Sequence, residues 1–273
     1  MKFNSIPKTI FYGLCLGISI LPPGFSVATM AMILGIYEDL ITLLNDLFSP
    51  RFKSGLKALI SLGIGAVVAI AVFSRLISDA ISLFAYQTNF FFLGMIVATV
   101  PLLYKQANVK QNFTLKHRLF LGLAVIITAS FAFTNNAQLV ELSREPTVLQ
   151  TLFLVFAGFL VSCSMILPGL SGALMLILLG AYQFLLDSVT TLDLAVLGSV
   201  TVGGVIGLVF CGKLIKHLIE NNETTLYSIS LGLVIGSILV VLSSGIPTGL
   251  ELLTSLGMAI VGFMSVTILN LKR

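Results

Sequence analysis

The stretch ILPGLSGALMLILLGAYQFL, residues 166–185, contains a proline and a glycine inside an otherwise apolar segment. The stretch LPPGFSVATMAMILGIYEDL, residues 21–40, interrupts a second apolar segment in the same way. A helix that crosses a membrane would be continuous here, whereas proline lacks a backbone N–H and glycine weakens helices. Two matching interruptions indicate a feature that the fold requires rather than an accident of one segment.

The composition around these stretches is that of an integral membrane protein. Hydrophobic residues make up 57% and charged residues 10% of the 273 residues, and the mean hydropathy is +1.09. Apolar segments recur at about the 20 residues that a membrane-spanning helix needs, not as the short alternating segments of a barrel. We therefore expect an all-α membrane protein, and an N-terminus that is retained because no cleavage site follows the first apolar segment.

The apolar segments divide into two groups of five. They lie at residues 7–21, 24–44, 55–74, 82–103 and 118–134, and at residues 148–167, 169–186, 194–212, 226–242 and 250–270. We expect a single membrane domain over residues 1–273, with a first repeat at 7–134 and a second at 148–270.

Sequence identities support this division. A shift of 145 residues, from position 23 to position 168, aligns Pro23, Gly24, Ser26, Ala28, Met30, Leu34, Gly35 and Tyr37 with identical residues. A shift of 138 residues, from position 74 to position 212, aligns SRLI with GKLI. If each repeat has five crossings, or three crossings and a hairpin, the number is odd. The second repeat is then inverted relative to the first.

The loop charges agree with an inverted arrangement whose two termini are cytoplasmic. Basic residues are enriched in the loops that face the cytoplasm. The loops predicted on that side contain Lys2, Lys8, Arg51, Lys53, Lys57, Lys105, Lys110, Lys116, Arg118, Lys213, Lys216, Lys272 and Arg273. The outer loops contain only Arg75 and Arg144 as basic residues.

We expect each break to lie inside the protein. Irregular backbone occurs at membrane depth only where it is buried in protein or lines a wet cavity. Proline suits the first turn of a helix, and helix N-termini attract anions. Broken or re-entrant helices from two inverted halves are typical of a transporter site near the midplane. The candidate anion-binding residues are Pro23, Gly24, Ser26, Thr29, Pro168, Gly169, Ser171 and Gly172.

The cysteines and histidines do not suggest a further site. Cys15, Cys163 and Cys211 are odd in number and lie in apolar segments, so we expect small core residues rather than disulfides. His117 and His217 are far apart, each beside basic residues. We expect no metal and no cofactor.

Two stretches of the second half, PGLSGALMLILLGAYQFLL (168–186) and GGVIGLVFCGKLIKHLIENN (203–222), carry a resemblance that extends over nearly the whole chain. They resemble the bacterial polyprenyl-phosphate transporter family of PopT type, in which two PGxSG-type motifs each precede a helix with a G-x-Y sequence. The second copy matches this pattern. The first copy departs from it, because Val27 and Ala28 stand where the family has two glycines, and Pro22 is a further departure.

The resemblance implies a lipid flippase without catalytic activity. Its cargo would be undecaprenyl phosphate, the carrier lipid of cell-wall biogenesis, returned from the outer to the inner leaflet of the bacterial plasma membrane. The partners implied are this lipid and the surrounding membrane lipids, with no nucleic acid. A proton and a sodium ion are equally compatible with the sequence as coupling ions, and the sequence does not fix the oligomeric state.

Two other functions are compatible with parts of the sequence. PGFSVAT, residues 23–29, faintly resembles the PGxSRSG-type loop of undecaprenyl-pyrophosphate phosphatases. That enzyme would need an arginine after the serine, where this chain has Val27 and Gly172. Amide-lined turns bind many anions, so a transporter of another small anion is the second alternative.

Two cations and two tyrosines complete the set of candidate residues. Arg75 and Lys213 occupy the same repeat position, and we expect them to contact the lipid phosphate at the outer and inner entrances. An ion pair with Asp79 is the structural alternative for Arg75. We expect Tyr37 and Tyr182 to be interfacial anchors, and Glu38 to be solvated near the cytoplasmic surface.

Overall fold

The structure of the protein is a computed structural model. It describes the chain except for residues 1–2, 4, 22–24, 48–51, 108, 110–112, 131, 133–146, 192, 244 and 272–273. Across the described residues, the secondary structure is helical and contains no strand. The helical class predicted from the apolar segments is therefore confirmed.

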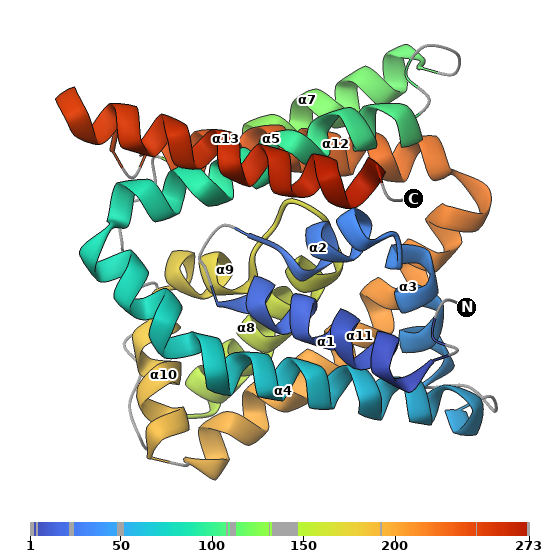
Figure 1. Cartoon of the computed structure of the whole chain (residues 1–273). Coiled ribbons are helices and arrows are strands. Elements are labelled where there is room, and N and C mark those ends of the chain that lie inside the picture. Colours follow the sequence, from blue (N-terminus) through green and yellow to red (C-terminus); the bar gives the residue numbers. More distant parts are fainter. Residues whose placement is uncertain are drawn as a thin grey trace.

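The helices follow the predicted segments closely (Figure 1). The first half contains α1 (Ile6–Ile20), α2 (Val27–Leu34), α3 (Tyr37–Asp46), α4 (Phe52–Leu83), α5 (Ala85–Gln106) and α7 (Leu115–Ser130). The second half contains α8 (Val148–Ile166), α9 (Gly172–Leu178), α10 (Tyr182–Thr190), α11 (Leu194–Asn221), α12 (Glu223–Ser243) and α13 (Gly249–Leu271).

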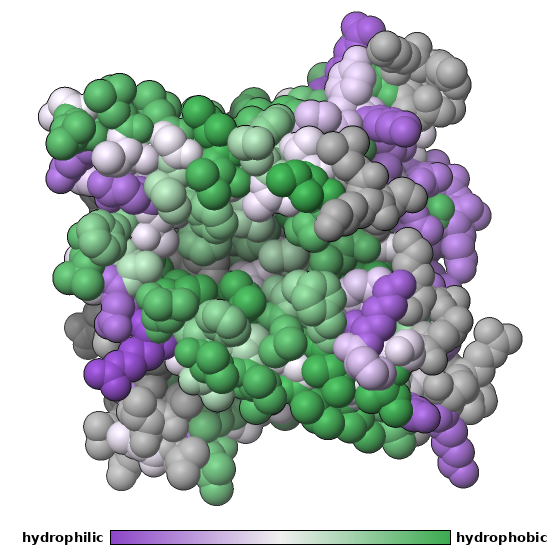
Figure 2. Space-filling view, viewed as in Figure 1, coloured by the Kyte–Doolittle hydropathy of each residue, from purple (hydrophilic) through white to green (hydrophobic). Residues whose placement is uncertain are grey.

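Six of the described helices are long and apolar enough to cross a membrane. These stretches are Gly55–Leu83, Ala85–Gln106, Val148–Ile166, Leu194–Asn221, Glu223–Ser243 and Gly249–Leu269. Hydrophobic residues cover the middle of the face shown in Figure 2, and hydrophilic residues gather toward its edges. The chain is thus a multi-pass membrane protein. The predicted segments 24–44 and 169–186 do not form single spans, because each is divided into two short helices.

The division occurs at the same glycine in both copies. Gly35 has φ 62° and Gly180 has φ 68°, a left-handed conformation that favours glycine. The N–H of Gly35 donates to the carbonyl of Met32, and the N–H of Gly180 donates to the carbonyl of Ile177. Each following residue bonds the carbonyl five residues before it, which completes a Schellman motif. The aligned sequences therefore adopt the same local structure.

Helices pack in corresponding pairs. In the first half α1 packs against α4, and in the second half α8 packs against α11. The remaining pairs join the halves, because α5 packs against α13 and α7 packs against α12. Figure 1 shows α13 lying along α5, with α12 and α7 side by side behind them. Since each of these two pairs combines a helix from the first half with a helix from the second, neither half forms a separate domain.

Close packing in the α8–α11 pair corrects one prediction. Cys163 of α8 and Cys211 of α11 form a disulfide, with their Cα atoms 5.5 Å apart, which is within the range that a disulfide requires. Cys15 is free. The expectation of three unpaired core cysteines was wrong because an odd number still allows one pair. The contact depends on how closely two helices approach, and the spacing along the chain does not reveal that.

Gly203 provides a test of this close approach. A Cβ atom at Gly203 would collide with the backbone carbonyl of Val155 on α8, whereas one at Gly198 of the same helix would have nothing within 4 Å. We expect Gly203→Leu to lower the free energy of unfolding by about 1–3 kcal/mol or more, because overpacking displaces the helices. Thermal unfolding in detergent would measure it, with Gly198→Leu as the matched control. Equal stability of the two variants would contradict the packing described.

Candidate functional site

The two Pro-Gly motifs meet in the interior of the protein. Thr29 of α2 accepts a hydrogen bond through Oγ1 from the backbone N–H of Gly169, at 3.1 Å. Ser26, at the N-cap of α2, donates through Oγ to the carbonyl of Leu167, at 3.3 Å. Both donor–acceptor pairs join residues more than 130 positions apart. The side chains of the first motif therefore bind the backbone of the second.

Tyr37 adds a third contact of the same kind. Its hydroxyl donates to the carbonyl of Ile166, at 3.1 Å, and its side chain is only 3% exposed. Ile166 is the last residue of α8, where carbonyls lack partners within the helix, and Pro168 has no N–H to offer. Tyr37 thus satisfies a carbonyl that the break leaves free. The prediction of an interfacial anchor was wrong for this tyrosine, since the turn between α2 and α3 leaves its side chain buried.

The contacts of Ser26, Thr29 and Tyr37 with residues 166–169 are called the motif junction below. Its hydroxyls are inaccessible in this conformation. Ser26 and Thr29 are each 2% exposed, and Ser171 is 4% exposed. Pro168 is also buried, and Gly172 is partly buried at the start of α9. Pro23 and Gly24 lie outside the described residues. Of the four anion-binding residues predicted in the first motif, the structure therefore describes Ser26 and Thr29.

Gly169 occupies a position that no other residue fits. Its φ is 91°, and a Cβ atom there would lie 2.6 Å from the backbone nitrogen of Val234 on α12. Both the conformation and the space therefore require glycine. The second motif is consequently held between the side chain of Thr29 and the backbone of α12.

Arg75 and Lys213 lie apart from the motif junction. Arg75 is exposed on α4 and Lys213 is exposed on α11. Asp79 and Arg75 are both described, and no ion pair joins them. The structural alternative that the sequence offered for Arg75 therefore has no support in this conformation.

A cavity of about 420 Å³ is lined in part by Ser74, the residue before Arg75 on α4. It is called the Tyr182 cavity below, and it is lined by Leu21, Ser74, Ile77, Ile81, Ser82, Ala173, Ile177 and Tyr182. Ser74 precedes Arg75 on α4, and Tyr182 begins α10 with 39% of its side chain exposed. The sequence did not predict this cavity, although the alignment of Tyr37 with Tyr182 marks one of its walls.

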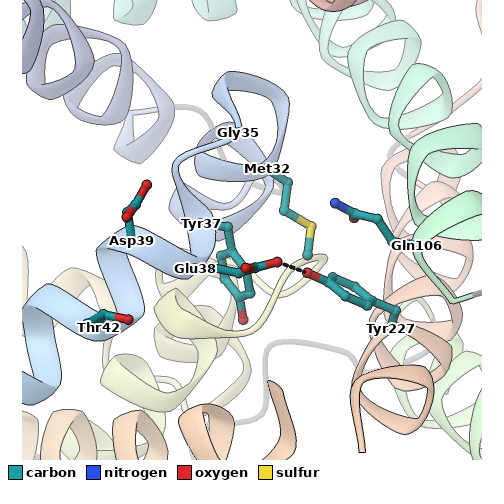
Figure 3. Close-up of a pocket in the computed structure, with 8 residues that line it drawn as sticks. All are labelled: Met32, Gly35, Tyr37, Glu38, Asp39, Thr42, Gln106 and Tyr227. Carbon is teal, nitrogen blue, oxygen red and sulfur yellow. Dashed lines mark hydrogen bonds between the residues drawn. The ribbon is translucent and has the colours of Figure 1, made fainter. Parts of the chain in front are cut away.

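A separate polar pocket of about 410 Å³ lies beside the end of α2 (Figure 3). It is lined by Met32, Gly35, Tyr37, Glu38, Asp39, Thr42, Gln106 and Tyr227. Tyr227 of α12 donates through its hydroxyl to Glu38, at 3.2 Å. Glu38 is exposed, as predicted, but it also ties α3 to α12. Two carboxylates without a basic residue in the lining repel a phosphate, so this pocket is a poor candidate for the head-group site.

An apolar cavity of about 500 Å³ lies on the other side of α2. It is called the Phe25 cavity, because Phe25 lines it and is adjacent to Ser26 of the motif junction. Its other walls come from α1, α2, α4, α5 and α13. Figure 2 shows a hollow bordered by hydrophobic residues between α13 and α1. A chain of hydrocarbon character can therefore approach the junction from this side.

The hydrogen bond between Thr29 and Gly169 generates a prediction. Thr29→Val keeps the size of the side chain but leaves the buried N–H of Gly169 without an acceptor, which costs about 1–3 kcal/mol. Thr29→Ser retains the hydroxyl and is the matched control. We expect only the valine variant to unfold at a clearly lower temperature in detergent. Identical unfolding of the two variants would show that the hydroxyl does not support the second motif.

Comparison with known proteins identifies the family. A family model described as VCA0040-like, undecaprenyl phosphate translocase-like, matches residues 16–249. A polyprenyl-phosphate transporter of Staphylococcus aureus is 32% identical over 265 residues, which is 93% of each chain. A polyprenyl-phosphate transporter of Vibrio cholerae is 30% identical over 244 residues, covering 85% of this chain and 76% of that one. No solved structure matches. The chain therefore belongs to the undecaprenyl phosphate translocase-like family.

Proposed function

We propose that the protein carries undecaprenyl phosphate, or a related polyprenyl phosphate, from the outer to the inner leaflet of a bacterial plasma membrane. The observation that carries this proposal is the motif junction, where broken helices from both halves meet inside a membrane protein of this family. Hydroxyl and amide groups are collected there at a point that lipid does not reach. Such groups can replace the hydration of a phosphate while its tail stays in hydrocarbon.

An inverted repeat is part of the proposal, and the packing supports it. A Cβ atom at Gly13 would collide with the carbonyl of Leu62, and one at Gly158 with the carbonyl of Val200. These two contacts occupy equivalent positions under the shifts of 145 and 138 residues. In Figure 1, α4 and its equivalent α11 run in opposite directions across the view. The same contacts made in opposite directions are what inverted repeats produce.

We further propose that α1 and α2 form a hairpin that enters and leaves the membrane on one side. The helix α1 has 15 residues, which at about 1.5 Å per residue is too short for a hydrocarbon core of roughly 30 Å. Since α8 has 19 residues, the second copy can reach further across. The motif junction then lies near the middle of the membrane.

In this scheme the Tyr182 cavity is the outer entrance. Arg75 is exposed next to Ser74 of its lining and presents a planar fork suited to phosphate. The phosphate then passes to the motif junction, where Gly24, Ser26, Gly169 and Ser171 are the proposed contacts together with the flanking residues Pro23, Thr29, Pro168 and Gly172. Lys213 receives it at the inner entrance. The Phe25 cavity accommodates the part of the tail nearest the head group.

Labelling of single cysteines would test the proposed orientation. Lys116 and Val148 are both exposed, at the starts of α7 and α8. With both termini in the cytoplasm, we expect an impermeant thiol reagent added to intact cells to label Val148→Cys but not Lys116→Cys. Both variants should be labelled after the cells are opened. Labelling of Lys116→Cys from outside would overturn the orientation.

Transport itself can be measured in liposomes that contain the purified protein and undecaprenyl phosphate. In liposomes that contain the protein, we expect the fraction of undecaprenyl phosphate accessible from outside to change within minutes. In protein-free liposomes, we expect this fraction to stay constant. Arg75→Gln should slow this exchange about ten- to hundredfold, which corresponds to losing a hydrogen bond to a charged group of about 1.5–3 kcal/mol. Asp79→Asn, four residues away on the same helix, is the matched control.

The outcomes of this experiment separate the alternatives. Unchanged accessibility relative to protein-free liposomes would contradict transport. Release of inorganic phosphate from undecaprenyl pyrophosphate would indicate the phosphatase alternative, and efflux of free phosphate from loaded liposomes would indicate a small-anion transporter. Equal, small effects of Arg75→Gln and Asp79→Asn would remove Arg75 from the proposed path.

A further inference from the structure

Two tyrosines that are equivalent in sequence differ in their contacts. Tyr37 and Tyr182 each begin a helix two residues after the glycine of a Schellman motif. Tyr37 is 3% exposed and donates to the carbonyl of Ile166. Tyr182 is 39% exposed, and no described residue accepts a hydrogen bond from its hydroxyl. The local backbone is the same, so the difference arises from the surroundings.

The alignment of the two copies indicates which carbonyl could accept a hydrogen bond from the Tyr182 hydroxyl. Under the shift of 145 residues, Leu21 is equivalent to Ile166. Leu21 follows α1 and precedes two prolines, as Ile166 precedes Leu167 and Pro168, so its carbonyl also lacks a helical partner. Leu21 and Tyr182 line the same cavity. The two equivalent residues therefore border a common space, and no hydrogen bond between them is formed.

The residues near the two tyrosines also differ in burial, and those near Tyr182 are the more exposed. Ile77 of α4 lines the Tyr182 cavity and is half-buried. Its equivalent in α11, Ile215, is only 2% exposed. On that side α3 packs against α11, and Asn45 donates to the carbonyl of Gly212 at 2.8 Å. The position of Ile77 thus borders a cavity, whereas the equivalent position of Ile215 is packed against its neighbours. Tyr37 and Ile166 themselves line an apolar cavity of about 360 Å³, so the two sides differ in the tyrosine hydrogen bond and in the packing around Ile77 and Ile215.

We infer that Tyr37 and Tyr182 are alternating latches, of which one at a time is hydrogen-bonded across the motif junction and keeps the nearby position 215 or 77 packed. In the conformation described here, Tyr37 is closed on Ile166 and the Tyr182 cavity is open. In the opposite conformation, Tyr182 donates to the carbonyl of Leu21, Tyr37 releases Ile166, and a cavity opens beside Ile215. This inference rests on the inverted repeat of the proposed function, and it assigns positioning roles to two residues that border the proposed phosphate path but are not among the proposed phosphate contacts.

Tyrosine-to-phenylalanine substitutions test the latches, because they remove one hydroxyl and keep the ring. Tyr37→Phe weakens the present conformation, whereas Tyr182→Phe weakens the opposite one. A neutral hydrogen bond of this kind shifts such an equilibrium roughly two- to tenfold. Tyr104→Phe is the matched control, since Tyr104 is 42% exposed on α5 and lines neither the junction nor the Tyr182 cavity.

The measurement is the rate of thiol labelling in liposomes without polyprenyl phosphate. Single cysteines replace Ile77 or Ile215 in a Cys15→Ser background, where Cys163 and Cys211 are protected by their disulfide. We expect Tyr37→Phe to raise labelling at position 215 about two- to tenfold and to lower it at position 77. Tyr182→Phe should change both rates in the opposite directions, and Tyr104→Phe should change neither.

Each other outcome has a definite meaning. Parallel changes at positions 77 and 215, including a rise at both from loss of structure, would overturn the latches, as would unchanged labelling in both variants. Because no lipid substrate is present, opposite changes at the two positions would support the latches even if undecaprenyl phosphate were not transported. Transport with parallel labelling changes would retain the proposed function and reject the latches.

Discussion

The structure depends on the need to satisfy backbone groups where two helices break within a membrane protein. Proline and glycine free the carbonyls of Ile166 and Leu167 and the N–H of Gly169, and lipid offers these groups no partner. They are satisfied by Tyr37, Ser26 and Thr29, all of which belong to the other half of the chain. The breaks thus oblige the two halves to meet, and the position of the candidate site follows from that obligation.

The remaining packing makes this meeting stable. Each half forms one pair of helices internally, α1 with α4 and α8 with α11. Two further pairs, α5–α13 and α7–α12, join a helix of one half to a helix of the other. Glycines allow backbones to touch in these pairs, as small residues do between helices in membranes. Gly94 lies against the carbonyl of Ala259, and its equivalent Gly232 lies against that of Leu121. The repeated sequence is therefore also a repeated set of contacts.

Much of this arrangement was predictable from the sequence because it depends on local properties. Segment length and hydropathy located the helices, and the repeated prolines and glycines located both breaks. Side-chain direction was not predictable, since it depends on the angles at which broken helices return. Tyr37 was expected at an interface and is buried, and Cys163 and Cys211 were expected to be free and are joined. The hydroxyls of Ser26 and Thr29 were expected to await a ligand, whereas here they bind backbone.

The hydrogen bond between the Thr29 side chain and the Gly169 backbone cannot form with the roles of the two copies exchanged. The residue equivalent to Thr29 in the second copy is Leu174, which carries no hydroxyl. If the halves exchange roles during a cycle, one arrangement gains a hydrogen bond that the other cannot form, and the two differ in free energy by about 0.5–1.5 kcal/mol from this source alone. A difference between the two halves at this single position would then favour one of the two arrangements over the other, even with no ligand bound.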